Sequence, residues 1–152
     1  MCDLAKSRIG LVGPGRMGLA IVKHLVRNGY PVIATDIGAA QLKQAEAAGA
    51  QTAASPAEVG KVSDFVISAV GYDDEATAVM TGPKGLLETM KKGSIIAISS
   101  TCAPETVEKL DALARANVGV PLIGAVRELV KEGRKIKQTN PPDWTGTGTD
   151  LS

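Results

Sequence analysis

Short apolar runs alternate with amphipathic segments along most of the chain. Five runs rich in valine, isoleucine and alanine are bounded by glycine, proline or polar residues, which is typical of buried strands. These predicted strands cover residues 8–12, 31–35, 64–70, 94–99 and 118–123. Between them apolar residues recur at helical spacing. This spacing predicts helices over residues 17–27, 41–48, 73–80, 85–90 and 104–116, and another that begins at Pro56.

Two of the predicted helices carry further local signals. Ser55, followed three residues later by Glu58, forms a capping box, and Pro56 suits the first helical position. In the first predicted helix the expected apolar face consists of Met17, Ala20, Ile21, His24 and Leu25. Because His24 belongs to this face, we expect it to pack in the interior rather than to take part in catalysis.

The alternation of strands and helices predicts a parallel sheet with helices on both faces. Right-handed crossovers then give an α/β, doubly wound Rossmann-like domain, which we expect over residues 1–123. Residues 124–152 lack this alternation and end in a stretch rich in proline, glycine and threonine. We predict a divergent tail there, with one short helix near residues 126–135 followed by disorder.

Composition narrows the class of protein. Of the 152 residues, 44% are hydrophobic, 22% charged and 3% aromatic, so an ordinary globular core must be built from aliphatic side chains. A net charge of +1 leaves no basic surplus for nucleic acid, and no apolar run approaches the roughly 20 residues of a membrane helix. Cys2 and Cys102 form no disulfide framework, and the first ten residues lack a signal-peptide core. We expect a cytoplasmic protein without nucleic-acid, membrane or metal partners.

A GxGxxG motif follows the first predicted strand and opens the first predicted helix. It consists of Gly13, Pro14, Gly15, Arg16, Met17 and Gly18. In a dinucleotide-binding turn, Gly13 allows the tight turn, Gly15 lets the backbone approach a pyrophosphate, and Gly18 lets the helix pack on the strand. The start of the helix offers free N–H groups to phosphates. The alternative is a glycine-rich β-α turn without a ligand.

An acidic residue stands where such a fold binds ribose. Asp36 ends the second predicted strand, 18 residues after Gly18. Its carboxylate can accept hydrogen bonds from ribose hydroxyls and would repel a 2′-phosphate, and Ile37 follows in place of a phosphate-binding arginine. We therefore predict NAD rather than NADP. Asp36 could instead only cap the turn into the next helix, and Arg16 could either assist phosphate binding or be a solvated residue.

Taken together, the motifs resemble the β-hydroxyacid dehydrogenases. This family includes the 3-hydroxyisobutyrate, tartronate-semialdehyde and L-threonate dehydrogenases, with 6-phosphogluconate dehydrogenase as a relative. The similar stretches run in order from Ile9 to Ile123. They are the strand and glycine motif up to Asp36, AGA-x-x-A-x-SPAEV at 48–59, DFVISAV at 64–70, GPKGLL at 82–87, and Ser-Thr-x-x-Pro at 100–104.

The resemblance implies roles for individual residues. The glycine motif would hold the pyrophosphate, and Asp36 with Ile37 would meet the ribose. Val70 and Gly71 would pass beside the cofactor, where the family usually has Leu-Pro, and Thr101 would also border it. Ser100 and Thr101 would bind the carboxylate of a small hydroxy-acid substrate. Ile98 stands where the family often has aspartate.

The resemblance stops after Ile123. The family continues with a Ser-Gly-Gly segment and a long helix that carries a catalytic lysine and an asparagine. Here Lys137 and Asn140 are three residues apart and run into two prolines, so they cannot share a helical face in that way. We assign no catalytic residue: Cys102 has no activating partner, and Lys84 and Lys109 are expected on the surface.

These observations predict a cofactor-binding domain of an oxidoreductase that oxidises a short β-hydroxy acid, in a chain cut short before its catalytic lysine. Two alternatives remain. The chain is a stand-alone NAD-binding module or non-functional fragment without turnover, or it is a small oxidoreductase that uses a partner subunit or an unrecognised base. An apolar patch left without its second domain would favour self-association.

Overall fold

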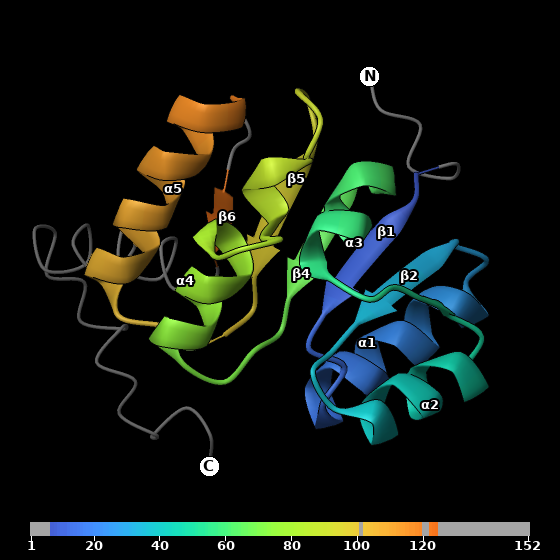
Figure 1. Ribbon diagram of the computed structural model, residues 1–152. Coiled ribbons are helices and arrows are strands. Elements are labelled where there is room, and N and C mark those ends of the chain that lie inside the picture. Colours follow the sequence, from blue (N-terminus) through green and yellow to red (C-terminus); the bar gives the residue numbers. More distant parts are fainter. Residues whose placement is uncertain (1–6, 101, 120–121, 125–152) are drawn as a thin grey trace, which may run out of the picture.

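The computed structural model describes residues 7–100, 102–119 and 122–124. Six parallel strands form one sheet in the order β3-β2-β1-β4-β5-β6 (Figure 1). The strands are β1 (Ile9–Val12), β2 (Val32–Thr35), β3 (Gln51–Thr52), β4 (Phe65–Ser68), β5 (Ile95–Ile98) and β6 (Leu122–Gly124). Val12 pairs with Thr35 on one side and Ser68 on the other, so three strands end level with one another. The predicted doubly wound Rossmann-like fold is confirmed.

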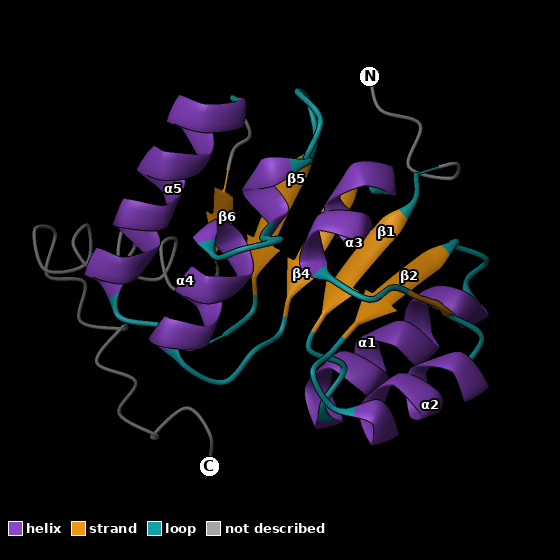
Figure 2. Ribbon diagram, viewed as in Figure 1, coloured by secondary structure: helices purple, strands orange, loops and turns teal. Residues whose placement is uncertain are grey.

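Helices cover both faces of the sheet (Figure 2). They are α1 (Arg16–Arg27), α2 (Ala39–Ala47), α3 (Pro56–Val62), α4 (Asp73–Thr81) and α5 (Pro104–Val118), and a 3-10 turn covers Leu86–Glu88. One hydrophobic cluster joins α1 and α2 to β1 and β2, and a second joins α3, α4 and α5 to β4 and β5. The two clusters lie on opposite faces, because Leu11 belongs to the first and its neighbour Val12 to the second.

The predicted capping box of α3 is confirmed. The Ser55 side chain accepts a hydrogen bond from the N–H of Glu58 at 3.3 Å. In return the Glu58 carboxylate accepts one from the N–H of Ala54 at 2.9 Å, one residue before the cap. The first bond satisfies an N–H group that a helix start leaves without a partner, and the second ties the residue before the cap to the first turn of α3.

The predicted apolar face of α1 is partly right: Ile21 and Leu25 pack against the core, but the face is not centred where the sequence placed it. The residues buried under α1 are Gly18 and Val22, whereas Met17 is 62% exposed and His24 is also exposed. His24 therefore does not pack in the interior. Nearly every position of this helix except its basic residues is small or apolar, so the periodicity alone could not fix the register of the buried stripe.

Two other differences concern short elements. The sequence did not predict β3, because its two residues are polar, exposed and at the sheet edge. The helix predicted over residues 85–90 is the 3-10 turn at Leu86–Glu88. The predicted tail helix near residues 126–135 lies outside the described residues.

Candidate functional site

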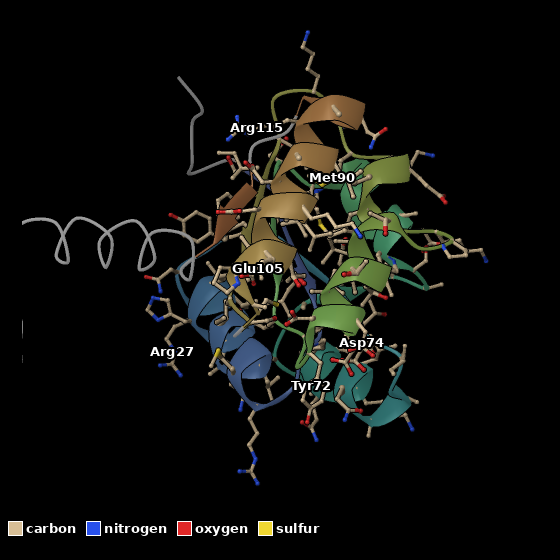
Figure 3. All side chains as sticks on the ribbon, turned by 90° about the vertical axis from the view of Figure 1, so that its left-hand side faces the viewer. Arg27, Tyr72, Asp74, Met90, Glu105 and Arg115 are labelled. Carbon is tan, nitrogen blue, oxygen red and sulfur yellow. The ribbon has the colours of Figure 1, made fainter. Side chains whose placement is uncertain are left out.

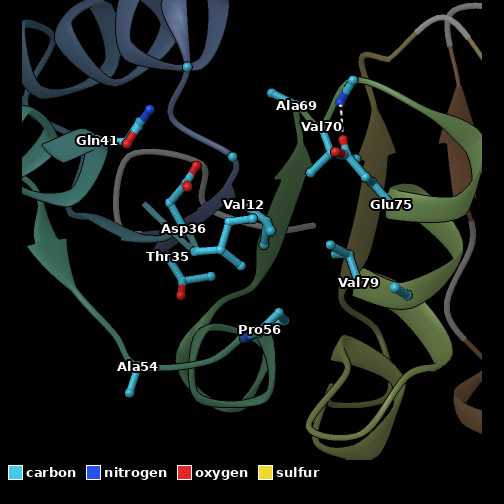
Figure 4. Close-up of a pocket in the computed structure, with 15 residues that line it drawn as sticks. Val12, Thr35, Asp36, Gln41, Ala54, Pro56, Ala69, Val70, Glu75 and Val79 are labelled. Carbon is cyan, nitrogen blue, oxygen red and sulfur yellow. Dashed lines mark hydrogen bonds between the residues drawn. The ribbon is translucent and has the colours of Figure 1, made fainter. Parts of the chain in front are cut away.

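A cavity of about 720 Å³ opens at the carboxyl ends of β1, β2 and β4. The helices after β1 and β4 lie on opposite faces of the sheet, which leaves a crevice where the strand order reverses. Its size is that of sites for small molecules and cofactors. The lining residues are Val12, Gly13, Gly15, Thr35, Asp36, Ile37, Gln41, Ala54, Pro56, Ala69, Val70, Gly71, Glu75, Ala78 and Val79 (Figure 4).

The turn between β1 and α1 forms part of the cavity wall. Gly13 has a φ of +85°, and a Cβ there would come within 2.9 Å of the carbonyl oxygen of Ala69. Gly15 differs, because a Cβ built on it would meet no atom within 4 Å and would stand in open space at the cavity. The backbone at Gly15, just before the first helical residue, can therefore approach a ligand closely.

Gly18 serves the packing of α1 on β1. A Cβ on this residue would collide with the carbonyl oxygen of Gly13 and come within 3.2 Å of Leu11 Cδ2. The three motif glycines thus have the geometries predicted from the sequence: a tight turn, an open approach and a close helix-strand contact. That the turn binds a cofactor remains a prediction.

Asp36 follows β2 and lies on one side of the cavity. Its Oδ1 accepts a hydrogen bond of 2.7 Å from the N–H of Gly38, which is the residue that caps α2. Asp36 therefore caps the turn into α2, which was one of the two roles that the sequence left open for it. Among the described residues no hydrogen bond reaches Oδ2, so this carboxylate retains acceptor capacity towards the cavity. Ile37 also lines the cavity and its side chain is fully exposed.

Val70 and Gly71 lie on the other side of the cavity, after β4, with Glu75 from the first turn of α4 (Figure 4). The N–H of Gly71 donates to Glu75 Oε2 at 2.7 Å. Asp36 and Glu75 are the charged side chains of the lining set. The sequence analysis missed Glu75; the signal that could have found it is an acidic helix start, directly after a strand that ends at the ligand edge of the sheet.

Other predicted residues do not line the cavity. Pro14 is fully buried beneath the turn, and Arg16 and Met17 are exposed on the first turn of α1. Thr101 lies outside the described residues. Lys84 and Lys109 are exposed, as predicted.

Ser100 lies past the end of β5 and is 7% exposed. Its Oγ is buried without a hydrogen-bond partner in the described part of the chain. Its carbonyl oxygen accepts from the N–H of Cys102 at 3.1 Å, just before α5 begins. The Oγ atoms of Ser63 and Ser68 are in the same state, so Ser100 is a candidate contact for a bound group because of its place just past the carboxyl end of β5 as well.

Cys102 and Asp73 lie beside one another near this segment. The pKa of Asp73 is lowered, mainly by a hydrogen bond of 2.6 Å from the Thr106 hydroxyl, with a further contribution from the N–H of Ala103. Burial and the negative charge of Asp73 raise the pKa of the Cys102 thiol. Because the thiolate is the reactive form, these surroundings agree with the prediction that Cys102 is not an activated nucleophile.

Within residues 7–100, 102–119 and 122–124, no group of three or more histidine, cysteine or acidic residues is placed to hold a metal ion. None of the helices in the same ranges has the length and apolar character needed to cross a membrane.

The crevice at the strand-order reversal, the glycine turn at its wall and the carboxylate after the second strand define a dinucleotide-binding α/β domain. Over residues 8–133 the sequence matches the family described as the NAD binding domain of 6-phosphogluconate dehydrogenase. The chain belongs to this family, as the resemblance predicted.

Relatives support this assignment. Mitochondrial 3-hydroxyisobutyrate dehydrogenase of Mus musculus is 33% identical over 126 residues, which are 80% of this chain and 38% of that protein. Mycobacterium tuberculosis 3-hydroxyisobutyrate dehydrogenase, solved with L-serine, shares the fold with a TM-score of 0.73 at 23% identity, over 78% of this chain and 40% of that one. The structure of Psf3 in complex with NADP+ and 2-OPP matches with a TM-score of 0.69 at 28% identity, over 75% of this chain and 40% of that one. The chain spans well under half the length of each.

Proposed function

We propose that the chain binds NAD in the cavity between β1 and β4. The observation that carries this proposal is Gly15: it borders the cavity at the start of α1, and nothing stands where its side chain would be. The pyrophosphate would lie there, against the glycine turn and the first turn of α1, where Arg16 and Met17 are exposed. Asp36 would accept hydrogen bonds from the ribose hydroxyls, beside Ile37.

The preference for NAD over NADP rests on charge. Asp36 and Glu75 are both acidic, and the lining residues within the described ranges include no lysine or arginine. A 2′-phosphate on the ribose would face the Asp36 carboxylate without a cation to balance it. Psf3, a relative in fold and sequence, is described with NADP+, so the preference of this chain must be measured directly.

The whole protein from which this domain derives would be an oxidoreductase of the 3-hydroxyisobutyrate dehydrogenase type. The bound cofactor would supply a hydride acceptor for the oxidation of a short β-hydroxy acid. Ser100, with its buried hydroxyl lacking a partner, would meet the substrate carboxylate together with Thr101. The reaction also needs a proton acceptor for the substrate hydroxyl. Among the described residues, those that line the cavity include no lysine or histidine for this task, and we propose that the chain binds cofactor without turnover.

Several predictions made from the sequence belong to the same proposal. They are the domain boundary at residue 123, the divergent tail over residues 124–152, the cytoplasmic location and the tendency to self-associate. The second candidate is a stand-alone NAD-binding module. Such a module would bind the same cofactor at the same site, but it would not derive from an enzyme that oxidises a hydroxy acid.

A calorimetric titration tests the proposal. We expect saturable binding of NADH, weaker binding of NADPH, and no NADH formation when NAD is mixed with 3-hydroxyisobutyrate, D-glycerate or L-threonate. Absence of heat with NADH at concentrations that saturate ordinary dehydrogenases would refute cofactor binding. Steady NADH formation with any of the three acids would refute only the absence of turnover.

A further inference from the structure

The segment between β4 and α4 sets one wall of the cavity but has few contacts that hold it. Pairing with β1 ends at Ala69, whose N–H donates to the carbonyl oxygen of Val12 at 2.8 Å. Helix α4 begins after Tyr72, whose carbonyl oxygen accepts from Ala76 at 2.9 Å. In the described part of the chain, the one hydrogen bond that the backbone between these two anchors makes joins Gly71 to Glu75. Val70 also packs against the hydrophobic core, so the part of the wall that depends on Glu75 is the backbone at Gly71.

The hydrogen bond between Gly71 and Glu75 has a charged acceptor, and its donor belongs to a glycine. The donor is the N–H of Gly71 and the acceptor is the carboxylate oxygen Oε2, at 2.7 Å. Hydrogen bonds to a charged acceptor are shorter and stronger than neutral ones. Glycine has more conformational freedom to lose than any other residue, so an anchor at Gly71 restricts the backbone more than it would elsewhere.

The wall also lies close to the glycine turn across the cavity. A Cβ on Gly13 would come within 3.1 Å of both the carbonyl carbon of Ala69 and Val70 Cγ1. The width of the cavity between the two sides is therefore fixed by where residues 69–71 sit. A shift of this segment would move the cavity wall against the turn that is proposed to hold the pyrophosphate.

We propose that Glu75 is a positioning residue for the dinucleotide: by accepting the Gly71 N–H, it holds the wall at the spacing that cofactor binding requires. The inference rests on the proposed function and adds a residue to it. If the wall occupies the binding conformation only a fraction of the time, the measured dissociation constant rises by the inverse of that fraction. Loss of the contact should thus weaken NADH binding without much effect on folding, because Glu75 is exposed.

The chain offers a matched control in the same helical turn. Asp74 is exposed, lies beside Tyr72 at the start of α4 (Figure 3), and makes no hydrogen bond within the described residues. Asp74→Ala removes one negative charge from the helix start, as Glu75→Ala does, but leaves the Gly71 contact in place. Glu75→Gln keeps an acceptor oxygen at the same position and removes the charge.

NADH titrations of these variants, with urea unfolding as the measure of stability, test the proposal. We expect Glu75→Ala to raise the dissociation constant by about five- to tenfold, and Glu75→Gln and Asp74→Ala to stay within about twofold of the wild type. Hydrogen exchange at the Gly71 amide, without NADH, should be faster in Glu75→Ala and unchanged in Asp74→Ala.

The outcomes separate this inference from the proposed function. A wild-type chain that binds no NADH overturns the proposed function. A wild type that binds, with a folded Glu75→Ala that binds equally well, overturns only the role of Glu75. Equal losses in Asp74→Ala and Glu75→Ala, or equal losses in Glu75→Gln and Glu75→Ala, would also overturn it. Either of these equal losses would show that the negative charge, rather than the hydrogen bond to Gly71, causes the change in NADH affinity.

Discussion

Gly18 lies so close to the carbonyl oxygen of Gly13 that no Cβ fits between them. The contact holds the first turn of α1 against the end of β1 and so fixes the direction in which the start of the helix faces the cavity. Because the obstacle is backbone rather than the end of a flexible side chain, a larger residue cannot be accommodated by a rotamer change.

Gly18→Ala should therefore destabilise the fold. Alanine gains up to about 1 kcal/mol from helix propensity, but the forced movement of the turn costs about 1–3 kcal/mol. We expect a net loss of unfolding free energy, measured by urea denaturation monitored by circular dichroism. An unchanged midpoint would show that α1 can move away from β1 freely, contrary to the packing described.

Gly15→Ala should leave the stability of the fold nearly unchanged but weaken the binding of NADH. Its Cβ meets no protein atom within 4 Å, so we expect the unfolding free energy to change by no more than about 1 kcal/mol, the usual scale of a change at a helix cap. The same methyl group stands at the cavity, and NADH binding should weaken by about tenfold or more. Normal NADH affinity in this variant would mean that the pyrophosphate does not approach the turn.

Asp36→Asn isolates the charge at the ribose end of the site. The amide oxygen can still accept the hydrogen bond from Gly38, so the turn into α2 should persist. We expect the ratio of NADPH to NADH dissociation constants to fall by about tenfold, because the repulsion of a 2′-phosphate is removed and an ionic acceptor for hydroxyls is lost. Parallel titrations with the two cofactors measure this ratio. If the ratio of the two dissociation constants is the same in Asp36→Asn and the wild type, Asp36 does not select the cofactor.

Asp73 should make stability depend on pH in the acid range. Its folded-state pKa is lowered from the ordinary 3.8, mainly by the Thr106 hydroxyl. A carboxylate with a lowered pKa stabilises the fold above 3.8, and this contribution disappears as the pH falls from 3.8 through the lowered value. Urea midpoints of the wild type should therefore drop more steeply below about pH 4 than those of Asp73→Asn. Asp74→Asn, the control, should follow the wild type.

The fold was largely predictable because its signals are local and agree with one another. Ser55 and Glu58 predict the start of α3, and the aliphatic runs predict the buried parallel strands. The register of α1 was not predictable, since Met17 and Gly18 are neighbours in a segment that is apolar almost throughout, and only the packing against Leu11 shows which of them faces the sheet.

The candidate site divides in the same way. Gly13, Gly15 and Asp36 could be found because the chemistry of dinucleotide binding restricts the residue types and their spacing. Glu75 had only the weak signal of an acidic helix start, because its proposed importance comes from a contact with the backbone of Gly71 and from the position of that segment at the crevice. Neither depends on a residue type that a motif would require.

The most direct test of the central claim is a map of NADH binding on the isotopically labelled chain by amide NMR shifts. The account predicts saturable shifts concentrated at Gly13, Gly15, Asp36 and Gly71, with α5 little affected. Shifts that fail to saturate, or that gather away from the cavity between β1 and β4, would contradict it.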